Sequence, residues 1–255
     1  MTDETLTIDR RYSGPRLTGN GGYVGGMLAS RLAADEREPV EITFRAPAPL
    51  ETPLSVARIG DDRLTLKHGE TLICEARRAP LDVEPPPFDI DWPRAEAIWR
   101  AGGSPEGSNF YDCIVCGRGR AEGDGLRVWG GPVNGGGLSW SLYHAHAAHA
   151  DAGGRIARVF VWGTLDCPGA WAAQDPRDWR PAVTGRLTAS ILERPRAGER
   201  CIVVGWRIGE DGRKLYSGTA LYTESGTLCA KALQTWILLK DAAEPGLADR
   251  PRAPT

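Results

Sequence analysis

The chain has 255 residues, and its 31 lysines and arginines nearly balance its 33 aspartates and glutamates. With 41% hydrophobic residues, the composition is typical of a globular protein and excludes a disordered chain. The lack of a basic excess argues against a nucleic-acid partner, and no apolar run approaches the roughly 18 residues of a membrane span. The acidic N-terminus has no apolar signal segment, and six cysteines are too few for a disulfide scaffold. We therefore expect a cytoplasmic enzyme or binding protein with reduced thiols.

The first predicted element is a helix at residues 22–34, with Asn20 as a favourable N-cap. This helix carries the adjacent glycines Gly25 and Gly26, although a glycine inside a helix costs about 1 kcal/mol relative to alanine. The helix is therefore expected to pack too closely against other backbone to admit side chains there. A helix wrapped by a curved antiparallel sheet would require such small residues at its contact with the sheet.

Short strands with alternating apolar residues follow this helix. Val40, Ile42 and Phe44 alternate in this way and predict a half-buried strand. Further strands of the first half are expected at residues 54–59, 64–66 and 72–78.

Two stretches rich in proline or glycine interrupt the chain. The first, at residues 83–110, predicts a linker with one short helix at 92–100, and the second, at 130–154, predicts a loop region. The tail at residues 242–255 is expected to be frayed.

The second half repeats the order of the first. A helix is predicted at residues 165–174, entered through the apolar run 159–163. Both halves then show a strand, a proline turn, a strand, a charged turn, a strand, a glycine turn and a strand, which indicates an internal duplication. The strands of this half are expected at residues 188–192, 201–208, 215–223 and 228–239.

Three segments carry a resemblance to hotdog-fold thioesterases. Asn20-Gly21-Gly22-Tyr23-Val24 and the helix after it resemble the first repeat of TesB-like acyl-CoA thioesterases. Cys113-Ile114-Val115-Cys116-Gly117 with residues 123–128 resembles the opening strand of PaaI-like thioesterases, and residues 164–172 resemble their helix with its catalytic acid. The resemblance implies an α+β tandem, or double, hotdog in which two curved antiparallel sheets each wrap a central helix. Its parts would be an N-terminal repeat at 1–82, the linker at 83–110, a C-terminal repeat at 111–241 and the tail.

Asp166 is the first candidate for catalysis. It lies between apolar residues, where an unpaired carboxylate is costly. The side chain is expected either to cap a helix that restarts at Pro168 or to act chemically, and the resemblance favours the second interpretation. Partial desolvation would raise its pKa and make it a better base.

The turn Asn20-Gly21-Gly22-Tyr23 is the second candidate. Backbone amides at a helix N-terminus form a positive site that can polarise a thioester carbonyl, and glycines let a substrate approach the backbone. The alternative is a tight turn that only enters the helix. Asn20 stands where the family's usual histidine would be.

The two candidates predict a single composite site. In the hotdog thioesterases that the chain resembles, the acid comes from one helix and the glycine turn from the neighbouring copy's helix. Counted from that family pattern, the acid of the first copy would fall near Ala29 and Ser30, and the glycine turn of the second near Arg158 and Val159, yet these residues are neither acids nor glycines. Each copy therefore keeps the half that the other lost. The amides of Gly22 and Tyr23 are expected to face Asp166, with Asn20 and Gly21 binding substrate.

Three further residues are secondary candidates for substrate binding. TesB-like enzymes combine an acid, a hydroxyl and a glutamine to orient water, which implies roles for Thr188, Ser190 and Gln234. The family's acid is missing before Thr188, where Leu187 stands, and this departure favours a mechanism based on Asp166.

Neither the cysteines nor the histidines give a complete metal site. Cys113 and Cys116 have the spacing of a zinc half-site, but no second pair exists at comparable spacing, so buried thiols are the favoured interpretation. His144, His146 and His149 lie in a glycine- and alanine-rich stretch that is expected to be a solvated loop. No metal and no cofactor is therefore expected.

The resemblance implies an acyl-CoA thioesterase that hydrolyses a fatty or aromatic acyl thioester to the free acid and CoA. Asp166 would act as general base or as nucleophile. A hydratase or dehydratase would need a histidine beside Asp166, and a non-catalytic protein that binds acyl-CoA or lipid would keep only the pocket. Pairing of two double hotdogs in a homodimer is a further expectation.

Overall fold

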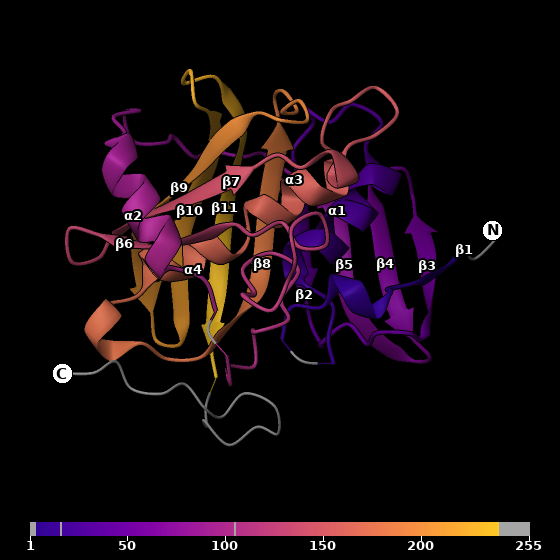
Figure 1. The fold of residues 1–255 in the computed structure, drawn as a ribbon. Coiled ribbons are helices and arrows are strands. Elements are labelled where there is room, and N and C mark those ends of the chain that lie inside the picture. The colour runs from indigo at the N-terminus through magenta and orange to yellow at the C-terminus, as the bar shows by residue number, and fades with distance from the viewer. Residues whose placement is uncertain (1–3, 16, 105, 240–255) are drawn as a thin grey trace.

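The computed structural model describes residues 4–15, 17–104 and 106–239. They form an antiparallel sheet of eleven strands in the order β1-β3-β4-β5-β2-β8-β11-β10-β9-β7-β6 (Figure 1). The strands are β1 Glu4–Thr7, β2 Val40–Phe44, β3 Pro53–Ile59, β4 Arg63–His68, β5 Thr71–Arg78, β6 Trp129–Val133, β7 Leu138–His144, β8 Ala182–Ile191, β9 Arg200–Asp211, β10 Lys214–Thr223 and β11 Leu228–Leu238.

The strands of the two halves of the chain do not intermix. The five strands before residue 79 occupy one side of the sheet and the six strands after residue 128 occupy the other (Figure 1). The halves join where β2 pairs with β8, in a register that places Val40 opposite Ala189 and Thr43 opposite Arg186. Segments far apart in the sequence thus meet in the middle of the sheet.

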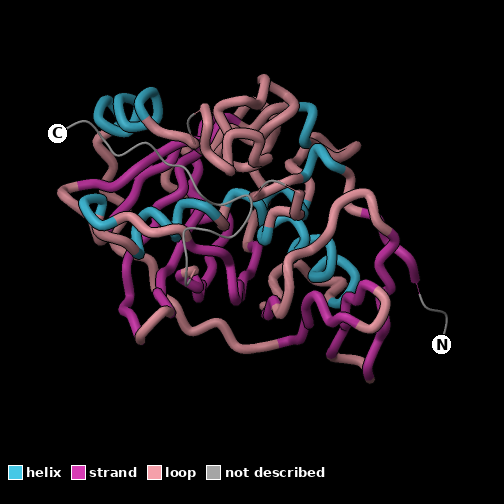
Figure 2. Tube along the Cα trace, turned by 90° about the horizontal axis from the view of Figure 1, so that it is seen from below, coloured by secondary structure: helices cyan, strands magenta, loops and turns pink. Residues whose placement is uncertain are grey.

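Three helices pack on one face of this sheet. They are α1 (Gly21–Leu32), α3 (Arg158–Thr164) and α4 (Cys167–Ala173), and in Figure 2 helical segments run across the molecule beside the strands. Helix α1 contacts β2, β5 and β8, whereas α4 contacts β7, β9 and β10, and α1 packs closely on α3. The predicted helix after Asn20 is confirmed.

The glycines of α1 serve the contact with α3. A Cβ atom on Gly26 would lie 2.8 Å from both the Cβ of Trp162 and the Cα of Val159. On Gly25 it would lie 3.3 Å from atoms of Trp162 and of Ile42 in β2. The expected close backbone contact therefore exists, but it is made mainly by a second helix rather than by the sheet.

The helix predicted at residues 165–174 is confirmed as α4, although α4 is shorter at both ends. The apolar run at residues 159–163, which was expected only to lead into this helix, is itself part of helix α3. Pro168 stands in the first turn of α4, where its missing amide costs nothing, but it cannot continue a helix from the preceding turn. Asp166 consequently lies at the bend between two short helices.

The predictions for residues 113–154 also need correction. No strand forms at residues 113–128, where the resemblance implied an opening strand; the segment is irregular and packs Leu126 and Val115 against Gly163 of α3. The expected loop at 130–154 instead contains the hairpin β6–β7. Its turn uses Asn134, Gly135, Gly136 and Gly137, all with positive φ, which explains the glycines that suggested a loop.

The short helix predicted in the linker is confirmed as α2 (Trp92–Ala101). It contacts β6 and β7 on the face of the sheet away from α4, in an apolar cluster with Trp140, Leu142 and Ile202. The remaining helical turns are η1 Arg10–Tyr12, η2 Ala147–His149 and η3 Pro176–Asp178. No helix of the described residues is long and apolar enough to cross a membrane. The predicted tail at 242–255 lies outside the described residues.

Candidate active site

Asp166 is buried at the centre of the molecule, with 3% of its surface exposed. It occupies the N-cap position of α4, yet its side chain makes no capping hydrogen bond. Its Oδ1 instead accepts a hydrogen bond from Thr184 Oγ1, and its Oδ2 accepts one from Asn20 Nδ2, each at 2.8 Å. The carboxylate therefore does not cap the helix. Capping was the alternative to a chemical role for Asp166.

Burial raises the pKa of Asp166 from 3.8 to about 6. Loss of solvent is the largest cause, and the neighbouring Cys113 adds to it. The hydrogen bonds from Thr184, the Gly22 amide and Asn20 act in the opposite direction, because they stabilise the charged form. A carboxylate with this pKa is ionised at neutral pH and is more basic than an exposed aspartate.

Asn20 links the N-terminus of α1 to the carboxylate. Its Oδ1 accepts from the Tyr23 amide at 2.9 Å, which caps the helix, while its Nδ2 donates to Asp166 and lies 3.9 Å from the sulfur of Cys113. The Tyr23 amide is thus committed to Asn20 rather than directed at Asp166, unlike the expectation from the sequence. The Gly22 amide does interact with the Asp166 carboxylate.

Two glycines permit this close approach. A Cβ on Gly22 would lie 2.8 Å from the Cβ of Asp166 and 2.7 Å from the carbonyl oxygen of Trp162. A Cβ on Gly21 would lie 2.9 Å from the side chain of Thr184. Any larger residue in either place would push α1 away from the acid.

None of the three secondary candidates lies on the cavity beside Asp166. Ser190, near the end of β8, donates its hydroxyl to the carbonyl oxygen of Arg37 at 2.8 Å. Thr188 is buried further along β8, opposite Leu233. Gln234 is fully buried, and its Nε2 donates to the carbonyl oxygens of Leu165 and Asp166, at 2.6 and 3.1 Å. Gln234 therefore holds the bend that carries Asp166.

Sequence reasoning missed Thr184, the hydroxyl that contacts the acid. The strand was expected to begin at residue 188, but β8 begins at Ala182. Pro181, directly before it, and Gly185 within it weaken the strand pattern. No signal in the sequence places this threonine opposite Asp166.

A cavity of about 400 Å³ opens beside these groups. Asn20, Gly21, Asp166 and Thr184 form its polar part. Its other walls come from both halves of the chain and are largely apolar; they include Phe44, Ala46, Pro47, Ala48, Phe110, Ala182, Val183, Trp236, Ile237 and Leu239. The cavity can therefore hold an apolar group next to a basic carboxylate.

At the far side of α1 from Asp166, the C-terminus of α1 meets the N-terminus of α3 through an arginine. Arg158, at the start of α3, donates to the carbonyl oxygen of Ala33, the C-cap residue of α1, from both terminal nitrogens at 3.1 Å. Arg158 also lies 3.7 Å from Glu36. An arginine thus fills the position where the duplication would have placed a second glycine turn.

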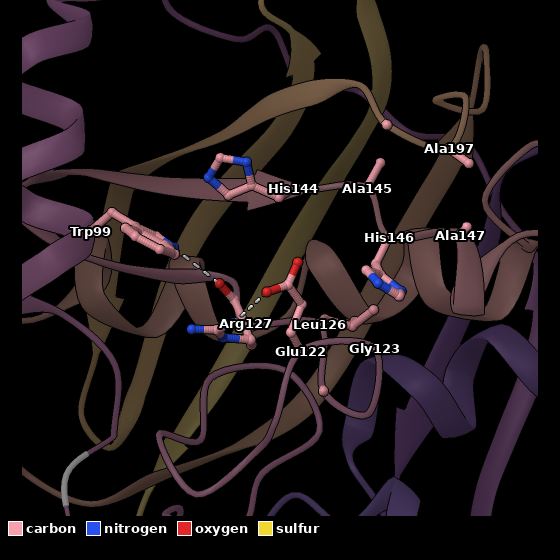
Figure 3. A pocket seen from close by; sticks show the side chains of 12 residues that line it. Trp99, Glu122, Gly123, Leu126, Arg127, His144, Ala145, His146, Ala147 and Ala197 are labelled. Atoms are coloured by element: carbon pink, nitrogen blue, oxygen red, sulfur yellow. Dashed lines mark hydrogen bonds and ion pairs between the residues drawn. The ribbon is translucent and has the colours of Figure 1, made fainter.

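A second, larger cavity of about 590 Å³ has no buried carboxylate like Asp166 among its described lining residues. Figure 3 shows Trp99 Nε1 donating to the Arg127 carbonyl oxygen and the pairing of Arg127 with Glu122. His144 and His146 line this cavity, but His146 Nδ1 accepts from the Ala148 amide. Among the described residues the histidines form no cluster that could hold a metal. His149 is buried, unlike the solvated loop expected for it.

Spacing along the chain does not connect Cys167 with the Cys-x-x-Cys pair of Cys113 and Cys116. The tertiary structure brings its sulfur within 4.8 Å of those of Cys113 and Cys116. Cys113 and Cys167 also line the cavity beside Asp166.

No protein-family model and no curated protein matches the sequence. Solved structures do match. A hotdog-fold protein of unknown function from Alicyclobacillus acidocaldarius aligns with a TM-score of 0.58 at 12% identity, over 93% of each chain. The chain has the hotdog fold.

Two thioesterase structures align over similar lengths. The tesB protein of Mycobacterium avium subsp. paratuberculosis gives a TM-score of 0.55 at 14% identity, over 87% of this chain and 88% of that one. The acyl-CoA thioesterase II TesB2 of Mycobacterium marinum gives 0.53 at 13% identity, over 94% of each chain. The resemblance to TesB-like proteins is thereby confirmed at the level of the fold.

Proposed function

We propose that the chain is a tandem double hotdog that hydrolyses acyl-CoA thioesters at one composite site between its repeats. The separation of the strands into two groups supports the tandem arrangement. The observation that carries the function is a desolvated carboxylate, Asp166, held by Asn20 from the other half of the chain beside a glycine-lined helix N-terminus.

Asp166 would supply the base. Ionised above its pKa of about 6, it can take a proton from a water molecule that attacks the thioester carbonyl, and the CoA thiolate leaves as the acid forms. Direct attack by the carboxylate, followed by hydrolysis of the mixed anhydride, uses the same placement.

The N-terminus of α1 would polarise the carbonyl. Gly21 is the first residue of the helix, so no carbonyl within the helix can accept from its amide, and it lines the cavity. This amide can stabilise the negative charge that develops on the carbonyl oxygen, whereas the Gly22 amide is engaged with the Asp166 carboxylate. The Tyr23 amide acts indirectly, because it fixes Asn20.

The cavity suits an acyl group of modest size. Its walls include Phe44, Phe110 and Trp236, which favour a fatty or aromatic chain. Arg45 also lines the cavity and is 57% exposed, so it can meet a phosphate of CoA. A homodimer and a cytoplasmic location stay predictions.

A non-catalytic acyl-CoA-binding protein is the second candidate. This candidate is favoured because two amides at the helix N-terminus already have partners within the protein. The Gly22 amide interacts with Asp166 and the Tyr23 amide donates to Asn20, so neither is directed at a substrate carbonyl. A hydratase or dehydratase is disfavoured, because no histidine lines the described part of this cavity.

Thiol release from a panel of acyl-CoAs separates these candidates. The wild-type chain should release CoA from at least one member, and Asp166→Ala should abolish the release. Asp178→Asn is the matched control, because Asp178 is exposed and lies outside the cavity. Saturable binding of acyl-CoA without release by the wild type would instead favour the binding protein.

A further inference from the structure

Three buried cysteine sulfurs form a cluster that the proposed hydrolysis does not use. Cys113 and Cys116 come from the irregular segment before β6, and Cys167 is the first residue of α4. All three sulfurs lie within 4.8 Å of one another, and all six cysteines of the chain are free thiols. The remaining three, Cys74, Cys201 and Cys229, are buried in strands outside the cluster.

The backbone around the Cys113–Cys116 pair forms one tight turn. The Gly117 amide donates to the Cys113 carbonyl oxygen at 2.9 Å, which closes one turn around both cysteines. A Cβ on Gly117 would overlap the carbonyl oxygen of Tyr111, so the turn requires glycine here.

We propose that Cys113, Cys116 and Cys167 bind a Zn²⁺ ion as three thiolate ligands. A tetrahedral zinc ion with bonds of about 2.3 Å to sulfur sets its ligands about 3.8 Å apart. The sulfur–sulfur separations of the cluster, none above 4.8 Å, exceed this spacing by at most about 1 Å. Three soft sulfur donors and no oxygen or nitrogen donor in the set favour zinc over magnesium or calcium.

The fourth ligand would come from the cavity. Cys113 and Cys167 line that cavity, whereas Cys116 faces away from it and contacts the hydroxyl of Ser104 at 3.3 Å. A water molecule on the cavity side can therefore complete the tetrahedron. The ion would tie the turn at residues 113–117 to the start of α4, next to Asp166.

The test is metal content, which does not depend on any activity. The full chain, purified reduced from zinc-supplemented cells, should carry about one zinc ion by elemental analysis and native mass spectrometry. After zinc is removed, cobalt should bind at the same stoichiometry and give the thiolate-to-cobalt charge-transfer band in the near ultraviolet. Cys116→Ala should lose both signals, whereas Cys201→Ala, a buried cysteine of β9, should keep them.

The cobalt titration of the wild type keeps the proposal falsifiable even if Cys116→Ala does not fold. A folded, reduced chain that binds neither zinc nor cobalt would overturn the proposal. So would cobalt that binds without the charge-transfer band, or a Cys201→Ala variant that alone loses the metal. These outcomes do not bear on thioester hydrolysis, which the Asp166 variants test separately.

Discussion

Replacing Asp166 with asparagine is expected to stabilise the protein at high pH while it removes the base. The asparagine keeps the shape of the side chain and can satisfy the same partners. Its oxygen can accept from Asn20 Nδ2, and its amide group can donate to the Thr184 hydroxyl, which then acts as acceptor. The perturbation is therefore mainly the loss of a buried negative charge.

The raised pKa of Asp166 sets the size of the effect. Because the folded state binds this proton more tightly than the unfolded state, the free energy of unfolding falls as the pH rises from 3.8 through about 6. The difference between these two values corresponds to about 3 kcal/mol lost above the folded-state pKa. The variant never ionises at this position and avoids that loss.

Urea denaturation across pH measures the effect. Near pH 4 the two proteins should have similar free energies of unfolding, and by about pH 8 the variant should be more stable by up to about 3 kcal/mol. Over the same range kcat/KM of the wild type should rise with pH up to about 6 and then level, and the variant should lose about 10²–10⁴-fold.

The pH dependence decides whether this reasoning holds. A variant that is destabilised equally at all pH values would show that ionisation of the buried carboxylate does not lower the free energy of unfolding. A wild-type activity profile with no inflection near this pKa would show that Asp166 is not the titrating base.

Two further predictions concern the neighbours of the acid. Thr184→Val removes a hydrogen bond that favours the charged form, so the pKa of Asp166 should rise and the acid limb of the pH–rate profile should move up by about one unit; Thr188→Val, as control, should leave the profile in place. Gly26→Ala inserts a methyl group against the backbone of α3 and should lower the free energy of unfolding by about 1–3 kcal/mol in urea denaturation. Gly209→Ala is its control, because a Cβ there meets nothing within 4 Å; equal losses in both variants would contradict the close packing of α1 on α3.

The sequence by itself determined the local helices and strands and singled out Asp166, but not all of the residues that Asp166 contacts. The N-cap of α1 at Asn20, the small-residue face of that helix and most strands follow from side-chain types and their period. These signals are local, because capping and alternation involve residues a few positions apart. Asp166 also stood out, since a carboxylate in an apolar context must find partners.

Only the tertiary structure decided what those partners are. Thr184 contacts Asp166 across 18 positions, and no pattern in the sequence indicates this pair. Asn20 contacts Asp166 across 146 positions, and this meeting was expected only from the family resemblance, not from any local signal. The hairpin β6–β7 was missed for a similar reason, since the pairing of β7 with β9 outweighs the local preference of glycine and proline for loops. Helix α3 was missed because its packing on α1, rather than a local signal, stabilises it. Cys167 likewise joins Cys113 and Cys116 only because the start of α4 packs beside the turn, and proximity in space rather than spacing in the chain makes three thiols a candidate metal site.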